Sequence, residues 1–113
     1  MALDRDYVTL AEIDMLVGVA ELRIFLGLGR EGGQPVSRSY AEQVVNGARF
    51  PAPLIRYPRK GRLHVRLWLL GPVLAWMDVN KPSWRGRLPA GSEHWTRERL
   101  MEFVDAQVFA LDT

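Results

Sequence analysis

The sequence predicts a mainly α-helical fold with one small β-hairpin and a further helix at its C-terminal end. Three observations lead to this fold class. Apolar residues recur at helical spacing in several short segments, and capping residues precede most of these segments. Residues 54–66 instead alternate between apolar and polar side chains around a turn. With 113 residues, of which 48% are hydrophobic, the chain fits one domain with its own core.

Two helices separated by Gly18 are predicted in the N-terminal part. Residues 9–12 have a capping-box pattern and apolar residues follow at helical spacing, so a short helix is expected near 10–16. A second helix is expected over 19–26, where apolar residues share one face. Gly27 is the predicted end of this second helix, because glycine is common just beyond helix C-termini.

A third helix is predicted over 38–46, after a connection with three glycines at 28–35. Ser37 is its expected N-cap, because a serine hydroxyl accepts a hydrogen bond from the first turn. The Asn-Gly pair at 46–47 suits the helix end. The side chains predicted to face inward are Tyr40, Ala41, Val44 and Val45. Those predicted to face outward are Arg38, Ser39, Glu42, Gln43 and Asn46.

A proline-rich step at 50–53 cannot be helical and leads into the predicted hairpin. Its strands are expected at 54–57 and 62–66, with the turn at 58–61. The second strand alternates between apolar and polar residues: Leu63 and Val65 against Arg62, His64 and Arg66. Successive side chains of a strand point to opposite faces, so the hairpin is expected to have one apolar and one basic face.

The segment after the hairpin, residues 69–77, predicts a fourth helix. Pro72 falls in its first turn, where a missing backbone N–H costs no hydrogen bond within the helix. Trp68 and Trp76 are expected in the hydrophobic core.

Residues 80–95 are rich in proline, glycine and serine and are interpreted as a linker. Trp84 and Trp95 either mark a protein interface or pack locally. Thr96 is expected to cap a last amphipathic helix that reaches about Leu111. Its apolar stripe consists of Leu100, Phe103, Val104, Gln107, Val108 and Leu111. The stripe either folds back onto its own chain or forms a dimer seam, and a linker before the helix favours the seam.

Positive charge is concentrated in the middle third of the chain. Residues 30–66 carry eight basic and two acidic groups, whereas the net charge is −3 over 1–29 and −1 over 67–113. Such a concentration favours a polyanionic partner.

Several other classes of protein are not expected. The absence of cysteine excludes disulfides and cysteine-bound zinc, and fits a cytoplasmic protein. We expect no signal peptide and no membrane contact, since no segment approaches the ~20 apolar residues of a membrane span. His64 and His94 form no metal-ligand pattern, the serines lack a nucleophile-elbow context, and the glycines complete no phosphate-binding loop. We therefore expect no catalytic residue, no metal and no cofactor.

The predicted elements follow the order helix, turn, capped helix, proline-rich step, basic hairpin, helix. The segments that carry this pattern are residues 16–22, 36–44, 50–53, 66–68 and 73–76. Over residues 16–77 the chain resembles the MerR-like winged helix-turn-helix group of small excisionase and AlpA-type DNA-binding proteins of bacteria and phages. It departs from that group in the enlarged connection between the two motif helices and in the extension 78–113.

The resemblance implies a winged helix-turn-helix DNA-binding domain at 1–79, the linker 80–95 and the C-terminal helix within 96–113. The helix that Ser37 caps would lie in the major groove, and the hairpin would grip the backbone or the minor groove. The residues expected to contact double-stranded DNA are Ser37, Arg38, Ser39, Glu42, Gln43, Arg49, Arg56, Arg59, Lys60, Arg62 and Arg66.

Two functions follow from these expectations. The first is a sequence-specific transcription regulator or an excisionase-like factor, both of which dock on duplex DNA. The alternative is a DNA-binding assembly subunit, similar to small terminase subunits, that recruits a protein partner through residues 78–113. A homodimer or a protein partner would use the stripe of the C-terminal helix. An adaptor without DNA binding is disfavoured by the basic residues of the hairpin.

Overall fold

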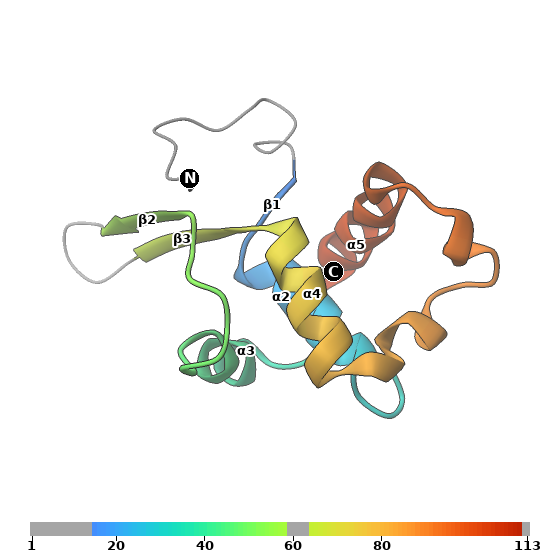
Figure 1. Ribbon diagram of the computed structural model, residues 1–113, viewed down its shortest axis with the longest axis horizontal. Coiled ribbons are helices and arrows are strands. Elements are labelled where there is room, and N and C mark those ends of the chain that lie inside the picture. Colours follow the sequence, from blue (N-terminus) through green and yellow to red (C-terminus); the bar gives the residue numbers. More distant parts are fainter. Residues whose placement is uncertain (1–14, 59–63, 112–113) are drawn as a thin grey trace.

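Figure 1 shows the computed structural model, which describes residues 15–58 and 64–111. Most of these residues are helical, and the strands form one small antiparallel sheet, which confirms the predicted balance of helix and sheet. The elements in chain order are β1 (Leu16–Val17), α2 (Val19–Leu28), α3 (Arg38–Val45), β2 (Ile55–Pro58), β3 (His64–Leu69), α4 (Leu70–Asn80), the 3₁₀-helices η1 (Pro82–Arg87) and η2 (Ser92–His94), and α5 (Arg97–Leu111).

The sheet has the strand order β1-β3-β2, with antiparallel pairing throughout. β2 and β3 form the predicted hairpin, in which Arg56 pairs with Arg66. The hairpin projects away from the helices, and α3 lies beneath it in the view of Figure 1. The predicted turn at 58–61 lies outside the described residues, apart from Pro58, which ends β2.

The strand β1 lies where the sequence predicted the end of a helix. The helix predicted near 10–16 does not extend to Leu16, which pairs with Leu69 of β3; residues 10–14 lie outside the described residues. Val17 pairs with Trp68 and is completely buried. The backbone of this segment is thus satisfied by the sheet, and the β-branched valine packs well on a pleated surface.

α2 extends two residues beyond its predicted end, so Gly27 does not end the helix. Gly27 is instead buried where the chain crosses α2: a Cβ atom built on it would lie only 2.2 Å from the Gln34 carbonyl oxygen. Glycine is required here for close backbone approach. Gly18 is the N-cap of this helix, and its backbone N–H donates to Glu21 Oε1 at 2.7 Å.

The enlarged connection between α2 and α3 is tied to α2 at its far end. The backbone N–H of Val36 donates to the Arg23 carbonyl at 3.1 Å, and Arg23 Nε donates to the Val36 carbonyl at 2.8 Å. The next residue, Ser37, is the N-cap of α3 as predicted: its Oγ accepts from the Tyr40 backbone N–H at 3.1 Å. The connection therefore fixes where α3 begins.

Residues 80–95, predicted as a linker, are folded into η1 and η2. Trp84 is completely buried, with its ring against Phe25 of α2 at a centroid distance of 5.7 Å. Its Nε1–H donates to Asp78 Oδ1 at 2.9 Å. Burial of a large aromatic side chain thus outweighs the turn-rich composition of this segment. Trp95 is partly buried and lies 5.7 Å from Phe103 by ring centroid, so both tryptophans pack locally.

α5 has the predicted bounds and the predicted cap, since Thr96 Oγ1 accepts from the Arg99 backbone N–H at 3.1 Å. Of the two arrangements considered for the stripe, the structure has the fold-back: α5 packs onto α2 of its own chain. Leu100 and Val104 are buried there, Phe103, Val108 and Leu111 are partly buried, and Gln107 is exposed. The stripe covers the chain's own core because the preceding segment is folded rather than extended.

Replacing Gly27 with alanine should destabilise the fold strongly. The new methyl group would meet backbone atoms of Gln34 and Pro35, which cannot rotate away. The loss in unfolding free energy should reach at least the ~3 kcal/mol typical of severe overpacking. Urea titration followed by circular dichroism measures it. The control is Gly86→Ala, where no atom lies within 4 Å and a change within about 0.5 kcal/mol is expected; equal losses in both variants would refute the close-approach assignment.

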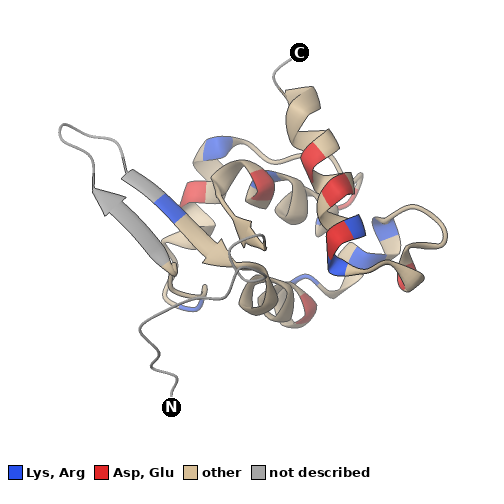
Figure 2. Ribbon diagram, turned by 90° about the horizontal axis from the view of Figure 1, so that it is seen from above, with Lys and Arg blue, Asp and Glu red and all other residues tan. Residues whose placement is uncertain are grey.

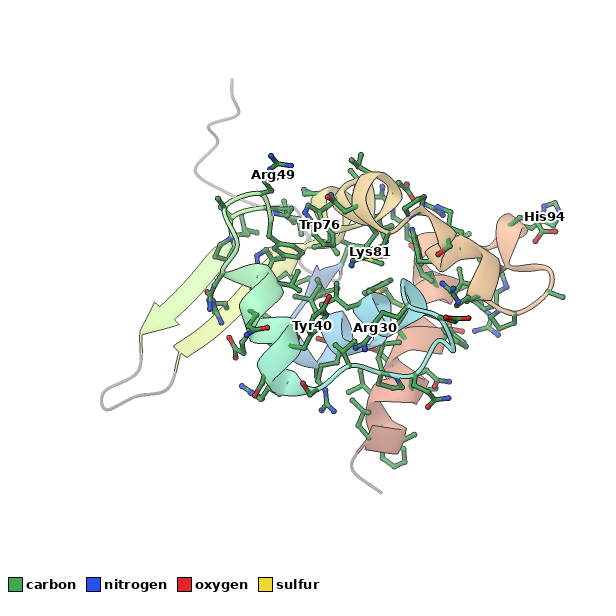
Figure 3. The ribbon with its side chains drawn as sticks, turned by 90° about the horizontal axis from the view of Figure 1, so that it is seen from below. Arg30, Tyr40, Arg49, Trp76, Lys81 and His94 are labelled. Carbon is green, nitrogen blue, oxygen red and sulfur yellow. The ribbon has the colours of Figure 1, made fainter. Side chains whose placement is uncertain are left out.

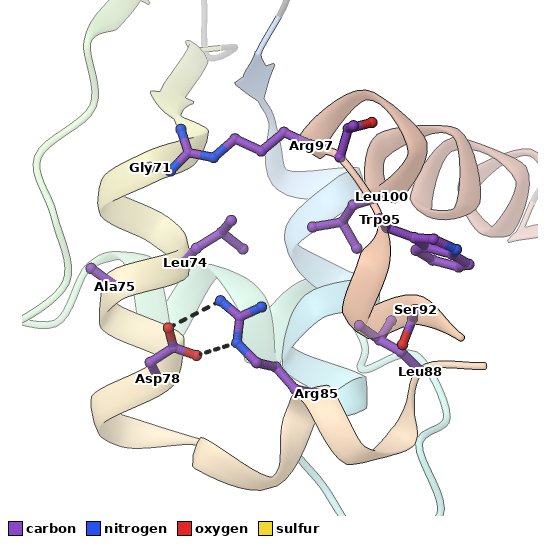
Figure 4. Close-up of a pocket in the computed structure, with 11 residues that line it drawn as sticks. Gly71, Leu74, Ala75, Asp78, Arg85, Leu88, Ser92, Trp95, Arg97 and Leu100 are labelled. Atoms are coloured by element: carbon purple, nitrogen blue, oxygen red, sulfur yellow. Dashed lines mark hydrogen bonds and ion pairs between the residues drawn. The ribbon is translucent and has the colours of Figure 1, made fainter. Parts of the chain in front are cut away.

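Asp78 should stabilise the C-terminal part in a pH-dependent way. Arg85 donates to both carboxylate oxygens (Figure 4), and this hydrogen bonding lowers the pKa of Asp78, against partial burial, which raises it. Because the pKa of Asp78 is lower in the folded than in the unfolded protein, the ionised carboxylate stabilises the fold. This stabilisation is complete above the unfolded-state pKa of about 3.9 and is lost as the pH falls through the folded-state pKa. Asp78→Asn should therefore lower the melting temperature at pH 7, and the difference from the wild-type protein should shrink as the pH falls below about 3.9.

Ionisation of Asp105 should affect stability in the opposite direction to ionisation of Asp78. Burial, and then the Glu21 carboxylate, raise the pKa of Asp105, so its charge destabilises the fold at neutral pH. Asp105→Asn should leave the melting temperature at pH 7 unchanged or higher. A lower melting temperature in this variant than in Asp78→Asn would contradict both assignments.

Candidate nucleic-acid interface

Arg66 joins the hairpin to α3. Its Nη1 donates to Asn46 Oδ1 at 2.8 Å, and its Nη2 contacts Glu42 Oε1 as an ion pair. Its guanidinium also lies 5.6 Å from the ring centroid of Trp68 on the same strand. The side chain is 15% exposed. The hairpin and α3, which are far apart in the sequence, are thus held side by side.

The chain between α3 and the hairpin is anchored by aromatic packing. Phe50 lies between Trp68 and Trp76, with centroid distances of 5.8 and 5.0 Å. The Trp68 Nε1–H donates to the Pro51 carbonyl at 2.9 Å. Trp68 is buried, as predicted, whereas Trp76 is only partly buried. These contacts fix the base of the hairpin relative to the end of α3.

The outer face of α3 is open to solvent. Arg38, Ser39, Gln43 and Asn46 are exposed, and Arg38 retains 70% of its side-chain surface. Ala41 and Val45 are buried on the opposite face, and Tyr40 and Val44 are partly buried, in agreement with the predicted orientation. The helix therefore presents polar groups outward while its apolar residues hold it to the core.

The predicted DNA-contact residues fall into three groups. Ser37, Arg38, Ser39, Gln43 and Arg49 are exposed on or beside α3. Glu42 and Arg66 pair with each other, and Glu42 Oε2 lies 3.7 Å from Arg38 Nε, so this carboxylate serves two arginines of its own chain. Arg56 lies in β2 opposite Arg66, and Arg59, Lys60 and Arg62 lie outside the described residues.

Two further cations lie beside α3 that the sequence analysis did not assign. Arg30, in the connection after α2, has its guanidinium carbon 5.3 Å from the Tyr40 ring centroid. Lys81, just after α4, lines a groove together with Gln43 and Arg49. Arg30 belongs to the basic segment 30–66, but no sequence signal indicates that it or Lys81 lies beside α3, since only the fold brings these segments together (Figure 3).

Charge is distributed unevenly around the fold. Figure 2 shows several acidic positions along α5, with basic positions near its start, and a basic position on the strand at the opposite side of the molecule. The acidic residues of α5 are Glu98, Glu102 and Asp105. Arg97 and Arg99 offset two of these charges, so α5 has only a small negative net charge, and a polyanion would be attracted to the vicinity of α3 rather than to α5.

Neither a metal-binding cluster nor a membrane-spanning helix is found among the described residues. Within residues 15–58 and 64–111, no cluster of three or more His, Asp or Glu side chains is placed to hold a metal ion. Among the helices described, none combines the length and apolar character needed to cross a membrane. The exposed polar groups around α3 are hydrogen-bond donors and cations, which suit the binding of phosphates and base edges.

Comparison with known proteins gives no independent assignment: no protein-family model, curated protein or solved structure matches the chain.

Arg66 and Glu42 should be energetically coupled in their contributions to the free energy of unfolding. Both side chains are largely shielded from water, so each loses a charged partner when the other is removed. In a double-mutant cycle of Glu42→Ala, Arg66→Ala and the double variant, we expect a coupling energy of about 1–2 kcal/mol in thermal or urea unfolding. The Arg99→Ala and Glu102→Ala cycle is the control, because that pair is exposed, at 50% and 72%, and coupling near zero is expected. Coupling no larger than the control would mean that the pair does not hold the hairpin to α3.

Proposed function

We propose that the protein binds duplex DNA with sequence preference, using α3 in the major groove and the β2–β3 hairpin on the backbone or in the minor groove. The observation that carries this proposal is the contact of Arg66 with Glu42 and Asn46. It sets the basic hairpin beside α3 and leaves the outer face of α3 free. A helix and an adjacent cationic ribbon can then engage one stretch of DNA together.

The exposed side chains of α3 have suitable chemistry for base edges. Arginine pairs with two acceptors of guanine, and glutamine pairs with adenine, so Arg38 and Gln43 are the candidates for base readout. Ser39 lies between them on the outer face and contributes a hydroxyl group. An α-helix of eight residues fits within the major groove, which is ~12 Å wide.

The hairpin supplies electrostatic attraction. Residues 54–68 contain five basic residues and no acidic residue, and of these five Arg66 is paired with Glu42. Phosphate contacts of this kind fix the position of a protein on DNA without reading its sequence. With roughly 6–8 phosphate contacts, affinity would fall by ~10³-fold or more between 50 and 200 mM salt.

The order α2, α3, hairpin, α4 agrees with a MerR-like winged helix-turn-helix, and we interpret the fold in that way. A transcription regulator and an excisionase-like factor remain alternatives within this function. Protection of a promoter in a footprint would favour the former, and protection of a recombination attachment site would favour the latter.

The assembly-subunit alternative loses its main support. It was favoured by the extension 78–113 and its two tryptophans. Trp84 and Val104 are instead completely buried within the chain, and α5 packs on α2. DNA binding therefore stands as the single proposed function.

Two classes of variant should distinguish the residues that read the base sequence from those that attract the DNA backbone. Replacing Arg59 and Lys60 together by alanine should weaken binding to all duplex sequences about equally. Replacing Arg38 or Gln43 by alanine should relax preference at one or two base pairs, by about 1–3 kcal/mol each. Selection from random duplex DNA, followed by mobility-shift titration of selected and scrambled duplexes, measures both effects. If the two classes lose affinity for both duplexes in the same ratio, the division of roles between α3 and the hairpin is wrong.

A further inference from the structure

α3 has two distinct flanks, one on each side of its exposed face. Residues on an α-helix advance by about 100°, so positions 42 and 46 share one flank and positions 40, 44 and 47 share the other. Arg66 of the hairpin contacts the first flank through Glu42 and Asn46. The exposed residues Ser39 and Gln43 lie between the two flanks.

The second flank borders an open groove of about 380 Å³. The end of α3, the chain after it and the end of α4 form its walls. The lining residues are Gln43, Val44, Gly47, Ala48, Arg49, Phe50, Trp76, Asn80 and Lys81, and none of them is acidic. Figure 3 shows Arg49, Trp76 and Lys81 on the same side of the molecule as Tyr40 and Arg30.

Three cations from three separate segments of the chain lie along this second flank. Arg49 and Lys81 stand at the C-terminal end of α3, and Arg30 lies over Tyr40 nearer its start. The stem of Lys81 packs against the end of α2, where a Cβ atom on Gly29 would lie 2.7 Å from Lys81 Cβ. Packing against α2 therefore holds Lys81 in place beside the second flank of α3.

These cations lack the carboxylate partners that four of the arginines have. Arg38, Arg66, Arg85 and Arg99 each lie within ion-pair distance of a carboxylate. Within the described part of the chain, no carboxylate lies within that distance of Arg30, Arg49 or Lys81. Their charge is available to an external anion.

We propose that this second flank binds the sugar-phosphate backbone of the DNA strand opposite the one that the hairpin grips. The inference rests on the proposed DNA binding and assigns a strand to each side of α3. A major groove is bordered by both backbones, so a helix within it has phosphates on either side. Cations on both flanks would centre α3 between the strands and hold Ser39 and Gln43 over the base edges.

The first test measures affinity and its salt dependence. Full-length protein is titrated by fluorescence anisotropy against a duplex selected from a random pool and against a scrambled duplex of equal length. Arg49→Ala combined with Lys81→Ala removes two phosphate contacts. The slope of log K against log salt should fall in magnitude by about 1.8, and affinity at 0.1 M salt should fall by about 50-fold. Arg30→Ala should lower the slope by about 0.9.

The matched control is Arg97→Ala, which removes an exposed arginine of α5 that has no ion pair with a described carboxylate. This variant should retain the wild-type slope. Circular dichroism melting of all variants verifies that they are folded. A wild-type slope in the Arg49→Ala/Lys81→Ala variant would overturn the inference and leave DNA binding intact, whereas no binding by the wild-type protein at 50 mM salt would overturn the proposed function itself.

Ethylation interference on each strand then tests the strand assignment. Wild-type protein should show two phosphate clusters that face each other across one major groove. The cluster on one strand should disappear with Arg49→Ala/Lys81→Ala, and the cluster on the other strand with Arg59→Ala/Lys60→Ala. Loss of the same cluster in both variants would overturn the assignment of opposite strands.

Discussion

The contact of Arg66 with Glu42 and Asn46 is the interaction on which the candidate interface depends. The hairpin projects beyond the helical core, so core packing fixes its base but not its inclination toward α3 (Figure 1). A planar guanidinium has five donors and can bond a carboxylate and an amide at once, while its face lies toward Trp68. This single side chain therefore links strand, helix and aromatic core. It is held internally, which leaves the more exposed cations for an external partner.

α2 organises the rest of the fold around this contact. Its Gly27 permits the chain to cross closely, and Arg23 fixes the last residues of the connection before Ser37. The position of α3 is thus set by the connection, whose added length does not loosen the helix pair. The same helix receives Trp84 through Phe25 and packs against α5. One helix consequently couples the candidate interface to the C-terminal half.

The C-terminal part supports the interface, and only the end of α4 and Lys81 border it directly. α4 follows β3 directly, so the hairpin and α4 form one continuous stretch of structure. Asp78 on α4 binds both Trp84 and Arg85, which closes the segment after α4 onto its own helix. Movement of the hairpin base is therefore resisted by packing that extends to α5. α5, with three acidic and two basic residues, packs on α2 rather than on α3.

The sequence by itself determined the features that depend on neighbouring residues. The Ser37 and Thr96 caps, the alternation that gives the hairpin, the bounds of α5 and the inward face of α3 were all predicted, because their causes lie within a few positions of the chain. Only the tertiary structure decided that Gly27 lies inside a helix, that Trp84 is core, and that Leu16 pairs with β3. It also brought Arg30, Arg49 and Lys81 to one flank of α3. These outcomes depend on distances between remote segments, which local spacing does not specify.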